Sequence, residues 1–416
     1  MDRIVVDGGA HLDGTVAVKG AKNAVLQQMV AALLAPGTYR ISNVPAILDV
    51  AYMESVLEHC GATCRRDDGV LAISVPDELK PEAPLDLVRR MRASVLAMGA
   101  LLARCGVARV ALPGGDDLGS RPIDWHLQGL RALGAEAELV HGEIVLRAPH
   151  GLNGTEIDLE FPSVGATQNV LLAAVLAKGR TVLFNAAREP EIVDLVEFLQ
   201  SMGADISGAG TATIMVEGVS DLHPCDHVTV PDRIEAGTFA VAAAITAGSV
   251  RVTGCRPEHL RMELNKLREA GCKVDAGDGW IHVLGPSRPR PLNFATLPYP
   301  GFHTDMHPQM VALLSVADGT SIMTENLYDS RFRYIGELNR MGADIHIDGG
   351  HAIVRGVDSL SGCEVDACDI RAGAAMVTAA LRARGRTNVV NASHIDRGYD
   401  GFVSKLEALG AAITWE

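Results

Sequence analysis

The feature that most constrains the fold is a sixfold internal repeat with a period of about 70 residues. In each copy an Ala-, Leu- and Val-rich stretch ends at a glycine, and a short β-branched run follows. These glycines are Gly37, Gly106, Gly179, Gly248, Gly319 and Gly385. A second, amphipathic stretch ends at a further glycine, at Gly61, Gly134, Gly203, Gly271, Gly342 and Gly410. Glycine is the usual left-handed C-cap, so each copy is predicted to form helix, strand, helix and paired strands.

The first helix of each copy is apolar nearly all round, as in VLLAAVLA, whereas the second has one polar face, as in VDLVEFLQSMG. A helix that is apolar all round must be buried. We therefore expect an α/β fold with helices inside a shell of sheets. Three copies would close each of two similar domains, with a cleft between them. An open repeat array is the alternative, although solenoid repeats are usually shorter, roughly 20 to 50 residues.

Charged residues recur at one repeat position, 14 or 15 residues before the first glycine of five copies. They are Lys22, Arg92, Arg233, Asp305 and Arg371. This position lies near the N-terminus of the helix predicted to be buried, where unpaired N–H groups bind phosphate or carboxylate. The helix dipole does not itself favour a cation there, so four cations at one repeat position predict a common anion site. Solvated surface cations are the alternative.

A second set of candidates follows the first strand of each copy, on predicted turns, where functional groups are commonly found. It comprises Asn43, Arg121, Arg188, Arg331 and Arg397. The loop 112–122, LPGGDDLGSRP, is rich in glycine and also holds Asp116, Asp117 and Arg121. Such a loop is typical of a mobile lid, and a merely flexible connection is the alternative. It contains neither a Walker A sequence nor a dinucleotide fingerprint.

The formal net charge of -14 argues against nucleic acid or an anionic membrane as a partner, so an anionic substrate requires a local cationic site. The amino terminus, MDRIVVDGG, lacks the apolar core of a signal peptide, and no apolar run approaches the ~20 residues of a membrane span. We therefore expect a cytoplasmic protein. The eight cysteines lack CxxC spacing, which predicts buried free thiols and no metal site.

Ten strings occur in a fixed order along essentially the whole chain: VKGAKNA, MRAS, LPGG, PSVGAT, NAAREPEIVD, PDRIEAGTF, TDM, ENLYDSRF, DIRAGAA and HIDRGY. In these strings the chain resembles the UDP-N-acetylglucosamine 1-carboxyvinyltransferase family of enolpyruvyl transferases. The related shikimate-phosphate enolpyruvyl transferases share the six-unit build. They typically begin with a GSKS-like motif, where this chain has GAKN.

The resemblance implies a two-lobed inside-out α/β barrel built from six units, with buried helices surrounded by sheets. Residues 22–230 would form the first lobe, with a mobile loop at 112–122, and residues 1–21 plus 231–416 the second. The implied reaction moves the enolpyruvyl group of phosphoenolpyruvate to the 3'-hydroxyl of UDP-N-acetylglucosamine by addition and elimination, releasing phosphate. This is the first committed step of peptidoglycan precursor synthesis. No metal, cofactor or obligatory protein partner is implied.

The resemblance also assigns roles to individual residues. The catalytic residues would be Asp116, Asp305, Lys22 and Arg397, with Asp305 as the base for the hydroxyl proton. Phosphoenolpyruvate would be bound by Lys22, Arg92, Arg121, Arg331, Arg371 and Arg397. The UDP-sugar would be contacted by Asn23, Arg92, Arg121, Pro122, Ile123, Asp124, Trp125, Ser163, Val164, Gly165, Asp305 and Leu327.

Asp116 departs from the family pattern. Most members have a cysteine there, which is assigned to proton transfer at C3 of phosphoenolpyruvate. A carboxylic acid can donate the same proton if burial or nearby anions raise its pKa. A carboxylate is a much poorer nucleophile than a thiolate toward the epoxide fosfomycin, so we expect resistance to this antibiotic.

Two further departures bear on the acceptor. Trp125 replaces a smaller aliphatic residue, and can stack on uracil or change which nucleotide fits. His303 replaces a proline beside Asp305, where it can tune the base or serve packing or the surface. They leave open transfer to another uridine nucleotide in nucleoside-antibiotic biosynthesis. A non-catalytic nucleotide-sugar sensor is the alternative of another class, but the presence of Lys22, Asp305, Arg121 and Arg397 together argues against it.

Overall fold

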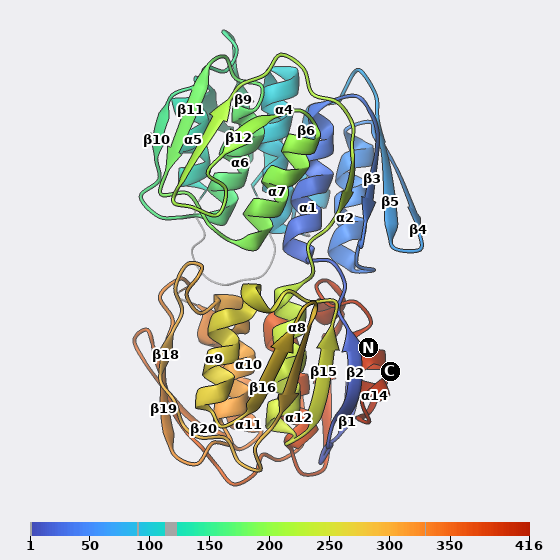
Figure 1. Ribbon diagram of the computed structural model, residues 1–416, viewed down its shortest axis with the longest axis vertical. Helices are drawn as coiled ribbons and strands as arrows, with labels where there is room; N and C mark the ends of the chain where they lie inside the picture. Colours follow the sequence, from blue (N-terminus) through green and yellow to red (C-terminus); the bar gives the residue numbers. More distant parts are fainter. Residues whose placement is uncertain (1, 90, 113–122, 329) are drawn as a thin grey trace. The chain divides into compact units, whose positions relative to one another are not determined.

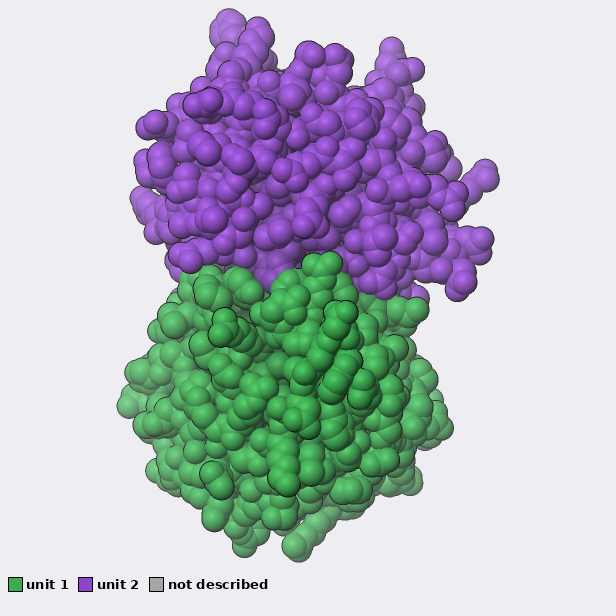
Figure 2. Space-filling model, viewed as in Figure 1, with its two compact units in different colours: residues 1–19, 117–121, 231–416 green, residues 20–116, 122–230 purple. Residues whose placement is uncertain are grey.

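A computed structural model describes residues 2–89, 91–112, 123–328 and 330–416 (Figure 1). The described residues form two compact units (Figure 2). Unit 1 contains residues 2–19 and 231–416, and unit 2 contains residues 20–112 and 123–230.

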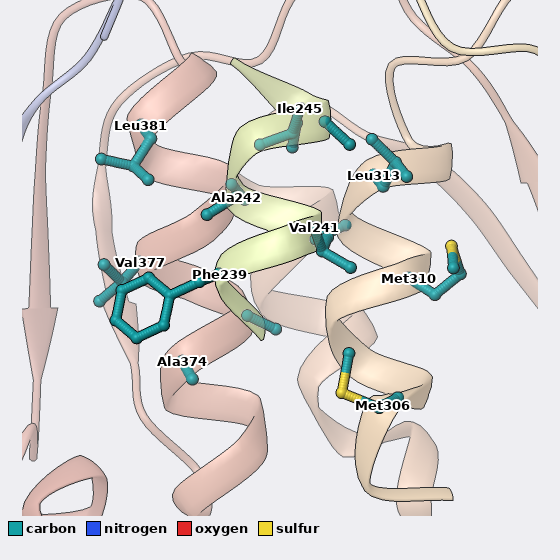
Figure 3. Packing of buried hydrophobic residues seen from close by; sticks show 14 of the residues in the cluster. Phe239, Val241, Ala242, Ile245, Met306, Met310, Leu313, Ala374, Val377 and Leu381 are labelled. Atoms are coloured by element: carbon teal, nitrogen blue, oxygen red, sulfur yellow. The ribbon is translucent and has the colours of Figure 1, made fainter. Parts of the chain in front are cut away.

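At the centre of each unit lie three helices that are buried along nearly their whole length. In unit 1 all 13 residues of one helix, Arg233–Ile245, are buried. Figure 3 shows this helix, α8, between its two neighbours, with Phe239 on the side of α12 and Val241 on the side of α10. The prediction of buried helices is therefore confirmed. They are α1 (Lys22–Ala31), α4 (Ala97–Cys105) and α6 (Val164–Ala174) in unit 2, and α8 (Arg233–Ile245), α10 (His307–Leu314) and α12 (Ile370–Arg382) in unit 1.

The second helix of each repeat except α7 buries fewer than half of its residues, as its polar face predicts, and α9 buries only Glu263, Leu264 and Leu267. These helices are α2 (Leu48–His59), α5 (Asp124–Ala132), α7 (Pro190–Ser201), α9 (Arg261–Glu269), α11 (Ile335–Arg340) and α14 (Phe402–Ala408). Short helical segments are η1 (Ala32–Leu34), α3 (Leu85–Val88), η2 (Arg92–Leu96), η3 (Pro257–Leu260), η4 (Thr304–Met306), η5 (Arg331–Tyr334) and α13 (Ser393–Asp396). None of the helices in the described ranges is long and apolar enough to cross a membrane.

The expected polar face of α7 is partly wrong, because eight of its 12 residues are buried. Among them is Asp194, whose carboxylate accepts a hydrogen bond from Gln28 and lies 3.0 Å from His227 Nε2. A buried carboxylate is tolerated when such partners satisfy its oxygens. The sequence pattern of α7 alone does not reveal these partners, since they come from α1 and from a distant strand.

Four-stranded sheets cover the helices of both units. In each sheet the strand after the buried helix pairs antiparallel with one strand and parallel with an edge strand. The sheets of unit 2 are β14 (Asp226–Val228)-β3 (Gly37–Ser42)-β5 (Val70–Val75)-β4 (Thr63–Asp67), β6 (Glu82–Ala83)-β7 (Val107–Ala111)-β9 (Glu143–Arg147)-β8 (Glu136–Val140), and β10 (Glu156–Asp158)-β11 (Arg180–Phe184)-β13 (Thr213–Glu217)-β12 (Asp205–Ser207). The sheets of unit 1 are β2 (Asp13–Ala17)-β15 (Ser249–Thr253)-β17 (Trp280–Leu284)-β16 (Lys273–Gly277), β18 (Phe294–Ala295)-β19 (Thr320–Thr324)-β21 (His351–Arg355)-β20 (Asp344–Asp348), and β22 (Glu364–Asp366)-β23 (Arg386–Val390)-β1 (Arg3–Asp7)-β24 (Ala412–Trp415).

Pairing between distant chain segments closes each unit. In unit 2 strand β14, from the end of the third repeat, pairs with β3 of the first. In unit 1 strand β2 pairs with β15 of the first repeat, and β1 lies between β23 and β24 of the last. Three repeats therefore close on themselves, so the open repeat array is wrong. The predicted arrangement, with helices inside and sheets outside, is confirmed.

The helix-ending glycines adopt the left-handed conformation that was predicted, with one exception. All six glycines after the second helix have φ between 91° and 107°. After α8 it is Ala247 that takes a positive φ, of 53°, and not Gly248. A Cβ at Gly248 would lie 2.3 Å from the carbonyl oxygen of Leu12, so glycine is needed there for close packing.

All eight cysteines are free, as predicted, but only Cys60, Cys255 and Cys272 are fully buried. The other five are partly exposed. Burial nevertheless raises the pKa of every one of these thiols. Because the thiolate is the nucleophile, these cysteines are poorly reactive.

Close approach of α4 and α6 makes Gly99 a sensitive position. A Cβ there would lie 2.5 Å from the carbonyl oxygen of Asn169. Gly99→Ala must push two buried helices apart, and should lower the free energy of unfolding by about 1–3 kcal/mol. Gly336→Ala in α11 is the control, because a Cβ there would have nothing within 4 Å. Chemical denaturation measures both variants, and equal stabilities would show that the α4–α6 contact yields without cost.

Candidate active site

The recurring charged residues lie at the N-terminal ends of the buried helices, as predicted. Lys22 is the first residue of α1, Arg233 is the first of α8, and Arg371 is the second of α12. Arg92 begins η2, which leads into α4, and Asp305 lies in η4, which leads into α10. Five of the six repeats therefore place a charged group at the equivalent end of an otherwise apolar helix.

In unit 1 three of the predicted site residues meet at the carboxylate of Asp305. Its Oδ1 accepts a hydrogen bond from Arg331 Nη2 at 3.1 Å, and its Oδ2 accepts one from Arg371 Nε at 3.3 Å. The arginine side chains are only 2% and 5% exposed, whereas that of Asp305 is 20% exposed. Asp305 thus remains accessible while the protein holds both of its cations.

Both arginines keep their charge despite burial. Burial alone would lower the pKa of Arg331, but the negative charges of Asp305, Asp369 and Glu325 outweigh it and raise the pKa. Burial likewise opposes a rise at Arg371, where Tyr399 and Asp305 raise the pKa. Arg331 Nε and Arg371 Nη1 are buried and have no hydrogen-bond partner within the described ranges. The pair therefore retains cationic donors that Asp305 does not use.

His303 fixes the turn that carries Asp305. Its ring Nδ1 accepts a hydrogen bond from the backbone N–H of Asp305 at 3.0 Å. The backbone N–H of His303 in turn donates to Glu263 Oε1 at 3.1 Å. The side chain thus caps the start of η4, a structural role closer to the expected packing than to a surface position.

The other predicted residues of unit 1 lie on loops and helix ends. Leu327 follows β19, and its backbone N–H donates to Glu325 Oε1 at 2.7 Å. Arg397 is the C-cap residue of α13 and is partly exposed. Arg233 places its guanidinium 5.4 Å from the centre of the Tyr299 ring.

In unit 2 Lys22 forms an ion pair at the start of α1. Its Nζ lies 2.6 Å from Oδ2 of Asp49 in α2, and the two side chains are 12% and 1% exposed. This carboxylate offsets the unfavourable interaction of a cation with the positive end of the helix dipole. Asn23 is the next residue along α1 and is partly exposed.

The segments around Trp125 and Ser163 come together in unit 2. The Trp125 ring stacks on Phe161, with ring centres 5.4 Å apart and planes at 19°. Trp125 lies in the first turn of α5, where Ile123 is the N-cap residue and Asp124 the first helical residue. The indole thus already has an aromatic partner within the chain.

Ser163, Val164 and Gly165 form the start of α6, where Ser163 is the N-cap residue. The Ser163 hydroxyl caps the helix by accepting a hydrogen bond from the N–H of Ala166 at 3.3 Å. A Cβ at Gly165 would lie 2.7 Å from His126 Cε1, so glycine allows α6 to approach α5. The first turns of these two helices are therefore in direct contact.

His126, beneath Gly165, is a neutral histidine. Burial, assisted by the charge of Arg92, lowers its pKa to about 3. Asn169 Oδ1 accepts the N–H of Gly99, which assigns Asn169 Nδ2 as the donor to His126 Nδ1 at 2.8 Å. The imidazole proton therefore resides on Nε2.

Three predicted site residues, Asp116, Arg121 and Pro122, lie outside the described residues. Within the ranges that are described, no group of three or more His, Cys, Asp or Glu side chains could hold a metal ion.

Several polar residues that support the site were not predicted from the sequence, among them Asp49, His126, His307 and Glu325. All four are buried. One signal was available: His307 stands at the start of HPQMVALL, an otherwise apolar helix. A buried histidine requires partners for its ring nitrogens, so its presence there indicated a polar network.

Comparison with known proteins identifies similar sequences. A family model described as EPSP synthase (3-phosphoshikimate 1-carboxyvinyltransferase) matches residues 6–406. The chain is 52% identical over 412 residues to a protein of Mycobacterium bovis named UDP-N-acetylglucosamine 1-carboxyvinyltransferase. That match covers 99% of this chain and 98% of the relative.

Two solved structures are similar along the whole chain. The enolpyruvyl transferase NikO from Streptomyces tendae superposes with a TM-score of 0.90 at 28% identity, covering 100% of this chain and 98% of NikO. EPSP synthase from Acinetobacter baumannii superposes with a TM-score of 0.75 at 19% identity, covering 100% of both chains. The second likeness shows the fold alone.

The buried His126 predicts a pH dependence of stability. Its folded pKa lies below its unfolded value, so its contribution is intact above about pH 6.5 and is lost as the pH falls toward 3. Between pH 7 and 4.5 this one group should lower the free energy of unfolding by about 2–3 kcal/mol.

In His126→Gln the free energy of unfolding should fall less between pH 7 and 4.5, by the same amount of about 2–3 kcal/mol. Denaturation followed by Trp125 fluorescence, in a Trp280→Phe, Trp415→Phe background, measures it in unit 2. Identical pH dependence with and without His126 would contradict a neutral buried imidazole.

Proposed function

Because the chain belongs to the EPSP synthase family of enolpyruvyl transferases, we propose that it transfers the enolpyruvyl group of phosphoenolpyruvate to the 3'-hydroxyl of UDP-N-acetylglucosamine and releases phosphate. The observation that carries this assignment is the 52% identity, over nearly the full length of both chains, with a UDP-N-acetylglucosamine 1-carboxyvinyltransferase. The product enters peptidoglycan precursor synthesis, as its first committed intermediate. We place the reaction in the cytoplasm, because both substrates are charged metabolites that do not cross a bilayer unaided.

Another uridine nucleotide is the second acceptor class. The 52% identity with a UDP-N-acetylglucosamine 1-carboxyvinyltransferase, against 28% with the enolpyruvyl transferase NikO, favours the UDP-sugar. The Trp125 indole also stacks on Phe161, so it does not require a uracil ring as its stacking partner. A non-catalytic sensor is not supported, since the family consists of enzymes.

The proposed reaction is an addition followed by an elimination. The 3'-hydroxyl oxygen bonds to C2 of phosphoenolpyruvate, its proton passes to Asp305, and C3 takes a proton from Asp116. Loss of a C3 proton and departure of phosphate from C2 then restore the vinyl group. Asp305 suits the role of base, because its carboxylate is partly exposed and is held in place by hydrogen bonds from Arg331 and Arg371.

Cations at the helix ends would bind the anionic groups of phosphoenolpyruvate and stabilise charge in the transition state. We assign this role to Lys22, Arg92, Arg121, Arg331, Arg371 and Arg397. The raised pKa values of Arg331 and Arg371 support it, since both stay charged in a buried setting.

The UDP-sugar would contact the paired segments of unit 2. The first turn of α6, with Ser163, Val164 and Gly165, offers backbone N–H groups suited to a diphosphate. We assign further contacts to Asn23, Arg92, Arg121, Pro122, Ile123, Asp124, Trp125, Asp305 and Leu327. The packing of Gly165 on His126, next to Trp125, supports a shared role for the two segments.

Phosphate release tests this function. The enzyme should release phosphate from phosphoenolpyruvate when UDP-N-acetylglucosamine is present, but not with UMP or shikimate 3-phosphate. Asp116→Ala should lower the rate by about 100-fold or more, the usual range for loss of a general acid. Release with UMP alone would instead assign the enzyme to a uridine-nucleotide acceptor.

Fosfomycin sensitivity tests the identity of the residue at position 116. Burial raises the pKa of all eight native thiols, so none is a ready nucleophile for the epoxide. The natural enzyme should keep its activity, whereas Asp116→Cys should lose it with time and gain the mass of one fosfomycin. Asp117→Cys is the matched control, with a thiol at the next residue. A fully insensitive Asp116→Cys variant would contradict the assignment of Asp116.

A further inference from the structure

A buried carboxylate that has no place in the proposed chemistry connects the segments around Asp305. Glu325 directly follows β19, and its side chain is 0% exposed. Its Oε1 accepts hydrogen bonds from Thr296 Oγ1 at 2.8 Å, from the N–H of Leu327 at 2.7 Å and from the N–H of Tyr328 at 3.3 Å. This oxygen therefore orders the turn that carries Leu327.

The other carboxylate oxygen holds the turn that carries Asp305. Glu325 Oε2 accepts a hydrogen bond from Thr304 Oγ1 at 2.9 Å, and Thr304 directly precedes Asp305. The same oxygen lies 3.1 Å from Nδ1 of His307, which is also 0% exposed. Five donors thus converge on one carboxylate, enough to offset the cost of burying its charge.

His307 extends the network to the helix of Arg331. Its Nε2 lies 2.8 Å from the hydroxyl of Tyr334, and Tyr334 ends η5, the segment that Arg331 begins. Burial lowers the pKa of His307 to about 4, although Glu325 opposes this, so the ring is neutral at pH 7. The neutral ring donates Nδ1–H to the carboxylate and accepts the Tyr334 O–H at Nε2.

The charge state of Glu325 agrees with this assignment. Burial would raise its pKa, but hydrogen bonds from His307, Thr296 and Leu327 outweigh burial and lower it. An ionised Glu325 can accept from all five donors at once, which a protonated acid cannot.

We propose that Glu325 is a positioning residue for the transfer reaction: through Thr304 on one side, and through His307 and Tyr334 on the other, it sets Asp305 against Arg331. This inference rests on the proposed role of Asp305 as the base. The distance between a base and its substrate matters strongly, since a displacement of about 1 Å can lower a rate about 100-fold. Glu325 acts on the rate without touching either substrate.

Glu325→Gln tests the inference with little change in shape. The N–H groups of Leu327 and Tyr328 are fixed by the backbone, so the amide oxygen must face them. The NH2 group then faces Thr304 and His307, where an acceptor is needed. We expect kcat to fall about 10- to 100-fold, with less than about a threefold change in KM for either substrate.

Asp194→Asn is the matched control. Asp194 is also a buried carboxylate beside a histidine, His227, but it belongs to unit 2 and to none of the proposed contacts. Both variants should lower the melting temperature, and Asp194→Asn should leave kcat within about twofold of the natural enzyme. A Glu325→Gln enzyme that loses stability like the control but keeps its kcat would overturn the positioning role.

A second variant, Tyr334→Phe, removes only the hydroxyl that links His307 to η5. It tests the positioning role if Glu325→Gln does not fold. It should lower kcat about three- to tenfold at unchanged KM, and an unchanged kcat would count against the link.

The crystal structure of Glu325→Gln separates this inference from the proposed function. A natural enzyme inactive on UDP-N-acetylglucosamine would contradict the proposed function alone. In either case the distance between Asp305 and Arg331 in the variant tests the positioning role of Glu325. A longer distance than in the natural enzyme supports this role, and an unchanged distance overturns it.

Discussion

The structure depends on helices that are buried on every side. In unit 1 every residue of α8 is buried, and α8 packs between α10 and α12. The charged side chains of the buried helices lie only in their first or last turns, which is where Lys22, Arg233 and Arg371 are found. The same burial that stabilises each unit thus determines where its chemical groups are.

Cations at helix N-termini require compensation, because the helix dipole and burial both disfavour them. Carboxylates provide it for Lys22 and Arg371: Asp49 pairs with Lys22, and Asp305 bridges Arg331 and Arg371. At the start of α12, Asp369 accepts the backbone N–H groups of Arg371 and Ala372. Such fixed pairs keep the charges in place before a substrate arrives, which is the arrangement that electrostatic catalysis needs.

Local sequence patterns predicted much of the fold, because these features depend on residues that are close together in the chain. The apolar helices, the left-handed glycines after the second helices and the equivalent positions of Lys22, Arg92 and Asp305 all follow from spacing within one repeat. What the sequence could not reveal depends on contacts between segments that lie apart in the chain. Glu325 and His307 are 18 residues apart and contact only because the start of α10 and the turn after β19 converge. The burial of Asp194 likewise requires Gln28 and His227, from the two ends of unit 2.

Proton NMR of the reaction run in D2O tests transfer by addition and elimination most directly. Addition should deliver deuterium to C3 of phosphoenolpyruvate, and elimination should then leave part of it in the vinyl group of the UDP-sugar product. We expect product vinyl signals of reduced proton intensity, together with one released phosphate per acceptor consumed. A vinyl group formed without deuterium, or phosphoenolpyruvate left unchanged beside UDP-N-acetylglucosamine, would contradict this chemistry.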